Sequence, residues 1–79
     1  MITPAQCRAG RGLLNWTQAQ LASRAHVSES TVRHFESGRH VPTHNNHKAI
    51  GLALEEGGVV FLHDSDVYGP GVRLRDREE

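Results

Sequence analysis

Through its first 58 residues the chain places apolar side chains among polar ones with the period of an α-helix. Four stretches show this pattern, and each follows a hydroxyl side chain that can accept a hydrogen bond from the backbone of the next turn. These four helix-starting residues are Thr3, Thr17, Ser28 and Thr43. After Thr3 and Thr17 a glutamine stands three positions on, as a capping box requires, and Pro4 fits a first helical position. The pattern predicts four short helices.

The ends of the four helices are marked by small residues and by changes of pattern. We expect them near Leu14, Ala25, Ser37-Gly38 and Gly57-Gly58, with Gly38 in the left-handed conformation. The apolar positions of the predicted helices are Cys7, Leu14, Leu21, Ala25, Val32, Phe35, Ile50, Leu52, Ala53 and Leu54. They predict a small helical core, with Trp16 beside it.

After residue 58 the period changes from that of a helix to that of a strand. Residues 59–62 form a short apolar run, and residues 72–75 alternate apolar and cationic side chains. Between them, Tyr68-Gly69-Pro70-Gly71 supplies turn chemistry. We therefore expect a mainly α fold: a helical part in residues 1–58, a C-terminal β-hairpin of the same domain in residues 59–75, and a frayed tail in residues 76–79.

The formal net charge of zero conceals two halves of opposite sign. Residues 1–50 carry six Lys or Arg and two acidic residues, whereas residues 51–79 carry three Arg and seven acidic residues. The halves therefore carry +4 and −4, and local charge governs attraction because salt screens charges beyond about 8 Å. The first half is suited to a polyanion, and the second to self-association or a basic partner.

Length and composition exclude several classes of protein. A chain of 79 residues forms one small domain, which gains stability from oligomerisation. Its single cysteine excludes an internal disulfide and suits a reducing compartment. With neither a membrane-length apolar run nor a signal-peptide pattern, we expect a soluble, cytoplasmic protein. No nucleophile–base pair, phosphate loop or metal centre is recognisable, so we expect no enzymatic activity and no cofactor.

The stretch from Thr17 to Arg39 carries the candidate chemistry, because it predicts two helices joined by a tight turn. The second helix directs four hydrogen-bonding side chains outward as one strip: Glu29, Ser30, Arg33 and His34. A helix fits the major groove of B-DNA, where each base pair presents a distinct set of donors and acceptors. The first helix of such a pair holds the second against the DNA backbone.

This stretch resembles the helix-turn-helix of the phage-repressor family, the Cro and cI-like or xenobiotic-response-element regulators. The matching positions are Gln18, Leu21, Ala22, Val27, Ser28, Thr31-Val32, Phe35-Glu36, Gly38 and Pro42. The resemblance covers about residues 5–56. It implies a lambda-repressor-like helical DNA-binding domain that acts as a sequence-specific bacterial or phage transcriptional regulator.

The resemblance also assigns roles to particular side chains. It places Thr17, Gln18 and Arg39 on backbone phosphates, and Arg11 in an ion pair with Glu36. The residues at positions that contact bases or the adjoining phosphates are Ser28, Glu29, Ser30 and His34, and we assign them to bases together with Arg33, which shares their strip. Apart from the resemblance, we also assign His40 and Thr43, after the third helix, to phosphates.

The chain departs from the family at the turn, where His26 replaces the usual glycine, and at the C-terminal hairpin. Histidine adopts left-handed angles only at some cost in free energy. Glu29 also counts against base readout, since a carboxylate is repelled by phosphates unless it accepts from a cytosine amine. The contrasting interpretation is a three-helix core with an ordinary solvated face and no DNA binding; Arg33 and the basic charge favour DNA.

Three further alternatives concern partners. His40, His44 and His47 could suggest a metal site, but they have no cysteine or carboxylate beside them, and we interpret them as histidines that face phosphates. The hairpin either covers the core or exposes an edge that pairs with a second chain, and we favour a homodimer on a palindromic operator. The main rival to a regulator is an antitoxin-type module whose acidic second half binds a small basic protein.

Overall fold

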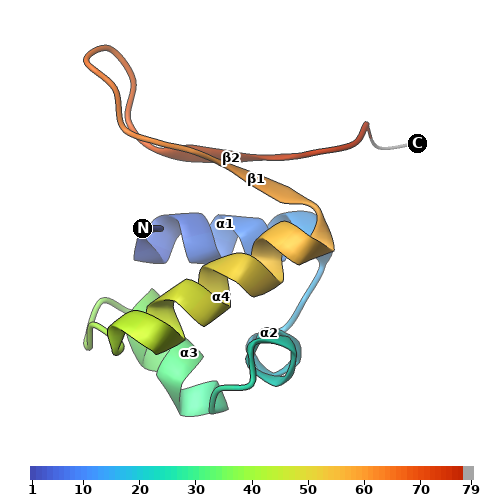
Figure 1. Ribbon diagram of the computed structural model, residues 1–79, viewed down its shortest axis with the longest axis vertical. Helices are drawn as coiled ribbons and strands as arrows, with labels where there is room; N and C mark the ends of the chain where they lie inside the picture. Colours follow the sequence, from blue (N-terminus) through green and yellow to red (C-terminus); the bar gives the residue numbers. More distant parts are fainter. Residues whose placement is uncertain (78–79) are drawn as a thin grey trace.

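The computed structural model describes residues 1–77 and contains four helices followed by a two-stranded hairpin (Figure 1). In chain order the elements are α1 (Pro4–Leu14), α2 (Gln18–Ala25), α3 (Glu29–Glu36), α4 (His44–Gly57), β1 (Val59–Leu62) and β2 (Gly71–Leu74). The prediction of a mainly helical domain with a C-terminal hairpin is confirmed. Residues 78–79 of the predicted frayed tail lie outside the described residues; residues 75–77 form no strand or helix.

Side-chain caps explain why the helices begin where they do. Thr3 and Thr17 each form a complete capping box with the glutamine three residues later. Ser28 and Thr43 accept from the backbone N–H groups of Thr31 and Asn46 in the same way. The helix starts are therefore set by local sequence.

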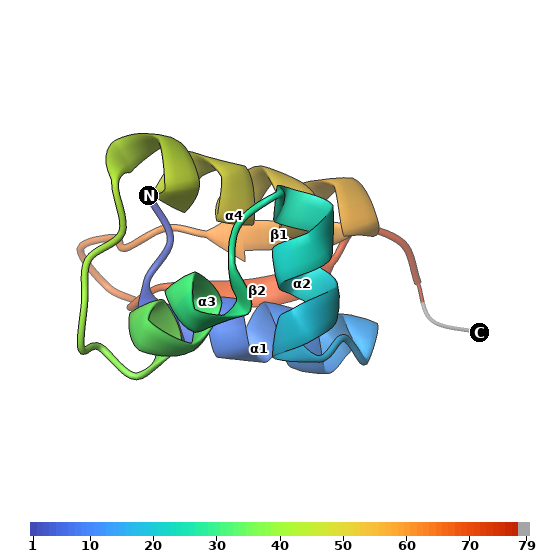
Figure 2. The same ribbon diagram turned by 90° about the horizontal axis from the view of Figure 1, so that it is seen from below.

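The hairpin and the α2–α3 pair lie at opposite ends of the domain, with α1 and α4 between them (Figures 1 and 2). The two strands are antiparallel, with Val59 opposite Leu74 and Leu62 opposite Gly71. The second strand begins one residue earlier than residues 72–75, the range predicted from alternation. Gln6 attaches this hairpin to α1, since its buried amide Nε2 donates to the carbonyls of Leu62 (3.1 Å) and Gly71 (3.0 Å).

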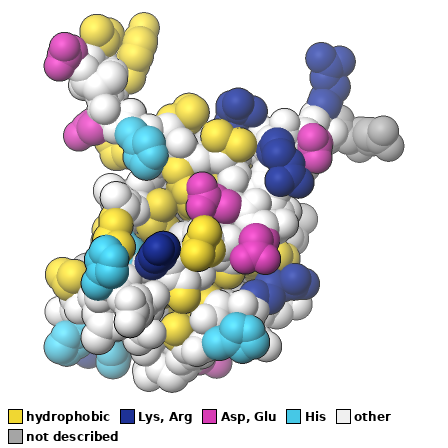
Figure 3. All heavy atoms as spheres, in the orientation of Figure 1, with side chains coloured by type: hydrophobic (Ala, Val, Ile, Leu, Met, Phe, Trp, Pro, Cys, Tyr) yellow, Lys and Arg dark blue, Asp and Glu magenta, His cyan; other side chains and the backbone are white. Residues whose placement is uncertain are grey.

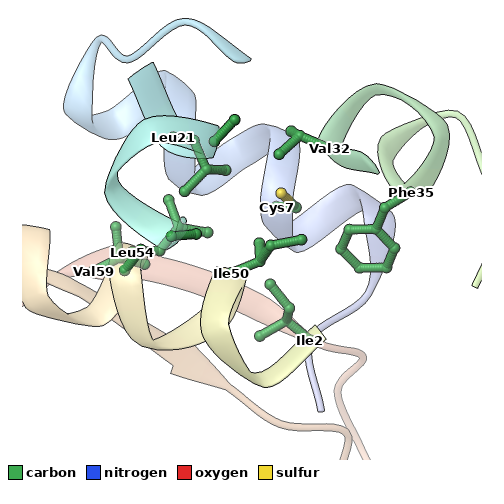
Figure 4. Packing of buried hydrophobic residues seen from close by; sticks show 11 residues of the cluster. Ile2, Cys7, Leu21, Val32, Phe35, Ile50, Leu54 and Val59 are labelled. Atoms are coloured by element: carbon green, nitrogen blue, oxygen red, sulfur yellow. The ribbon is translucent and has the colours of Figure 1, made fainter. Parts of the chain in front are cut away.

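The core lies where all four helices and the first strand meet (Figure 4). Its buried apolar residues are Ile2, Cys7, Leu21, Ala22, Ala25, Val32, Phe35, Ile50, Ala53, Leu54 and Val59. Most are the periodic positions that the sequence indicates, but Ile2 precedes the first helix and was not predicted. None of the helices in residues 1–77 is both long and apolar enough to cross a membrane.

The C-terminal end of α4 fits closely against the α1–α2 connection through a glycine. A Cβ added at Gly57 would lie 2.6 Å from Cη2 of Trp16, far inside van der Waals contact. The guanidinium of Arg24 lies over the same indole, 4.4 Å from the ring centroid. This contact fixes α4, and through it the hairpin, against α2.

Candidate nucleic-acid interface

The turn between α2 and α3 holds the two helices at a fixed angle (Figure 2). His26 adopts φ 58° and ψ 42°, the left-handed conformation expected of the glycine that it replaces. Its neighbour Val27 donates a backbone hydrogen bond of 3.0 Å to Ala22 at the end of α2. The turn therefore ends α2 with the usual left-handed residue, although histidine is strained in that conformation.

The two sides of α3 differ in burial. Val32 and Phe35 are buried, at 0% and 4% exposed, and hold the helix to the core. On the opposite side Glu29 and Arg33 are exposed, and Ser30 and His34 are half-buried. The four side chains lie side by side over the first turns of the helix because they occupy positions i, i+1, i+4 and i+5.

A hollow with mixed polar and apolar lining joins the exposed side of α3 to the segment that leads into α4. It is lined by Ser30, Thr31, His34, His40, Thr43 and Asn46, among other residues. The rings of His34 and His40 lie 5.8 Å apart between their centroids. The fold thus brings two residues assigned to bases, Ser30 and His34, next to two assigned to phosphates, His40 and Thr43. Asn46 completes the hollow and was missed; its place three residues after the Thr43 cap is a signal that could have indicated it.

Thr17 precedes α2 and Arg39 follows α3, and both are exposed. Arg39 follows Gly38, whose φ of 75° turns the chain away from α3. Among the residues assigned to DNA, Arg33 and Arg39 carry exposed guanidinium groups, and Glu29 carries an exposed carboxylate. This balance of charge favours a polyanion.

Beneath this surface, a buried carboxylate ties three helices together. Glu36 is 3% exposed and receives Arg11 through two bonds, Nε to Oε2 at 2.6 Å and Nη2 to Oε1 at 2.7 Å. Gln18 Nε2 donates to Oε1 at 3.0 Å, and the thiol of Cys7 donates to Oε2 at 3.2 Å. Arg8 donates to the backbone carbonyl of Glu36. The network connects α1, α2 and the end of α3.

The network sets the ionisation of its members. Burial by itself would raise the pKa of Glu36, but hydrogen bonds from Arg11, Gln18 and Cys7 outweigh it and hold that pKa below its ordinary value. Burial and then the hydrogen bond to Glu36 raise the pKa of the Cys7 thiol. Cys7 is therefore a neutral donor in the core and lacks the thiolate that a reactive cysteine needs.

Several side chains assigned to DNA from the sequence already have partners within the protein. Thr17, Ser28 and Thr43 cap their helices, and the amide of Gln18 donates to Glu36. The Thr17 and Thr43 hydroxyls can still donate and Gln18 keeps its amide oxygen, whereas the Ser28 hydroxyl also lies 2.7 Å from Thr31 Oγ1 and 3.1 Å from Ser30 Oγ. For these four residues a structural role accompanies any contact with DNA.

The interpretation of His47 as a phosphate-facing histidine is wrong. Its Nε2 lies 2.7 Å from the carbonyl oxygen of Ile2, and its ring packs edge-on against Phe35 at 4.7 Å between centroids. The side chain therefore holds the N-terminal segment against α4. The prediction failed because the i, i+3 spacing of His44 and His47 does not show which side of α4 faces the core. Within residues 1–77, no three His, Cys, Asp or Glu side chains are grouped so that they could hold a metal ion.

Comparison with known proteins agrees with this geometry. Residues 5–50 match the family model of the helix-turn-helix domain. The match covers more than half of the 79 residues and includes α1, α2, α3 and the first turns of α4. None of the curated proteins matches the chain significantly.

Proposed function

The chain belongs to the helix-turn-helix domain family, and from this membership we propose that it is a sequence-specific, double-stranded DNA-binding transcriptional regulator. The observation that carries the proposal is the exposed strip on α3. It presents Glu29, Ser30, Arg33 and His34 on a helix whose other side is fixed in the core. Such a strip has the size and donor set needed to read base edges in the major groove.

The residues divide into two roles. The side chains of the strip, together with Ser28, select sequence by contacting base edges. The second set positions the domain by contacting phosphates; its members are Thr17, Gln18, Arg39, His40 and Thr43. The Arg11–Glu36 pair contacts no DNA in this scheme and keeps α3 in place.

Two arginine substitutions separate these roles. Replacement of Arg33 by alanine should weaken binding to the preferred site by about 1–3 kcal/mol and relax the preference at one base pair. Arg39→Ala should weaken binding to all sequences alike. It should also reduce the slope of log affinity against log salt concentration by the amount that about one phosphate contact contributes. Fluorescence anisotropy on matched and mismatched duplexes over a salt series measures both effects. A uniform loss in both variants contradicts the assignment of Arg33 to readout.

We further propose that the protein binds a palindromic operator as a homodimer in the cytoplasm. Its small size supports a dimer, because a domain of this length gains much from added buried surface. A two-fold dimer that places both α3 helices on one face of DNA requires half-sites about 10 bp apart.

The second candidate function is an antitoxin-type protein-binding module, and the tip of the hairpin favours it. Val67 and Tyr68 are 76% and 77% exposed there, next to the acidic Asp64 and Asp66. An exposed apolar pair with acidic neighbours suits a basic protein partner that offers an apolar pocket. Co-purification of a small basic protein with the wild-type chain, and its loss on Tyr68→Ser, would support this candidate; purification of the chain without such a protein would contradict it.

A further inference from the structure

A groove of about 240 Å³ lies between the exposed side of α4 and the first strand. Its lining includes Met1, Lys48, Gly51, Leu52, Glu55 and Phe61. Leu52 is 46% exposed and Met1 is 61% exposed, so large apolar side chains meet solvent here. Figure 3 shows hydrophobic side chains grouped over α4 and below the hairpin. A patch of this kind on a small domain marks a contact with another molecule.

Two side chains of opposite charge stand on either side of Leu52 in this groove. Lys48 and Glu55 stand four residues before and three residues after Leu52, so the three side chains lie along one side of α4. All three are exposed. At Gly51, beside Leu52, an added Cβ would meet no described atom within 4 Å apart from its chain neighbours and the backbone of its own helix, which leaves room for a second helix to approach. We call Lys48, Gly51, Leu52 and Glu55 the α4 face.

We infer that the α4 face joins two copies of this chain, with their α4 helices antiparallel about a two-fold axis near Leu52. In this arrangement each Lys48 lies opposite Glu55 of the other copy, and the two Leu52 side chains pack together with their grooves facing. A two-fold contact uses the same patch twice, so a patch with opposite charges on either side of an apolar centre is complementary to itself. The hairpin contributes through Phe61, which lines the groove.

The placement of α3 agrees with this axis. In Figure 1 the α4 helix faces the viewer, the hairpin lies above it and α3 lies below it. A two-fold axis that runs from the hairpin end to the α3 end, within the plane of contact, leaves both α3 helices at the same end of the dimer. The inference rests on the proposed function, since it provides the dimer that a palindromic operator requires.

Charge reversal tests the α4 face. In each single variant, Lys48→Glu or Glu55→Lys, both pairs of side chains that face each other across the axis carry like charges. Each variant should therefore raise the dissociation constant of the dimer by about tenfold to a hundredfold. An equimolar mixture of the two variants restores both pairs in the heterodimer and should return to the wild-type dissociation constant, as should the double variant. Asp66→Lys is the matched control, because Asp66 is an exposed carboxylate in the hairpin loop, outside the α4 face, and it should leave dimerisation unchanged.

Sedimentation velocity over a concentration series gives the dissociation constants, and circular dichroism checks that each variant is folded. The inference is overturned if the single variants dimerise like the wild type, which would place the interface elsewhere, as on the free edge of the first strand. It is also overturned if the wild type is monomeric at every concentration or if the mixture fails to recover. Binding of Glu55→Lys to a duplex with a single half-site separates failure of this inference from failure of the proposed function. If the variant still binds the half-site, DNA recognition is supported whatever the dimer interface is.

Discussion

The inner and outer sides of α3 differ in burial and in how their polar groups are paired. On the inner side, Val32, Phe35 and Glu36 are buried, and each oxygen of the Glu36 carboxylate has a partner. On the outer side, Glu29 and Arg33 are exposed and form no side-chain hydrogen bond within residues 1–77. A side whose polar groups are satisfied serves stability, whereas a side whose polar groups are free is available for recognition. The contrast therefore separates the residues that hold the helix from those that could read DNA.

The strongest way to break this contrast is to remove the buried carboxylate. Glu36→Ala should lower the free energy of unfolding by about 3 kcal/mol, because it leaves Arg11 and Gln18 without their shared acceptor. Glu29→Ala is the matched control on the outer side and should change stability by less than about 0.5 kcal/mol. Urea denaturation followed by circular dichroism measures both. Equal effects would mean that the two sides of α3 do not differ in the way described.

On the outer side, the same control variant has an effect on binding. If Glu29 accepts from a cytosine amine, Glu29→Ala should cost about 1–3 kcal/mol on the preferred site and remove the preference at one base pair. Binding to unrelated duplexes should rise slightly, since a carboxylate that repels phosphates has been removed. Anisotropy with single-base-pair variants of the site measures this. Improved binding to every sequence, with the base preference unchanged, would exclude Glu29 from readout.

The ionisation of Glu36 sharpens the contrast further. Its pKa is lower in the folded protein than in the unfolded chain, where it lies near the ordinary value of about 4.3. The unfolded chain therefore binds more protons between those two values, and the stability that Glu36 provides is present above pH 4.3 and lost as the pH falls through the folded pKa. Denaturation from pH 7 downward should show this loss in the wild type and less of it in Glu36→Gln. Parallel curves for the two proteins would count against a depressed pKa.

The smallest expected effect is at the turn that joins the two helices. His26→Gly should relieve the left-handed strain and raise the free energy of unfolding by about 0.5–1 kcal/mol, whereas His26→Ala keeps the strain and should change it little. Thermal denaturation of the two variants side by side makes the comparison. If glycine is no better than alanine, the strain at position 26 is absent.

Much of the inner side of α3 could be predicted from the sequence, because its signals are local or belong to a fixed register. The caps Thr3, Thr17, Ser28 and Thr43 each act within one turn, so the helix starts were predicted correctly. Arg11 and Glu36 are paired in the structure as the resemblance implies, because the helix-turn-helix register brings the two helices together.

The contacts that were not predicted join distant parts of the chain. Ile2 enters the core, and Gln6 reaches the hairpin through the carbonyls of Leu62 and Gly71. His47 bonds to the carbonyl of Ile2. No local pattern encodes such contacts, since they depend on how α1, α4 and the hairpin pack. For the outer side, the sequence predicted which residues share the strip, but it carries no information about the DNA opposite them.

The central claim is that the outer side of α3 reads a DNA sequence, and selection of bound duplexes from a random pool tests it most directly. The account predicts an enriched motif whose two halves are related by a two-fold axis about one helical turn apart, with one position losing its preference in Arg33→Ala. Arg39→Ala should enrich the same motif with lower affinity. A pool that shows no enrichment after repeated selection with the folded wild-type protein would contradict sequence-specific DNA binding.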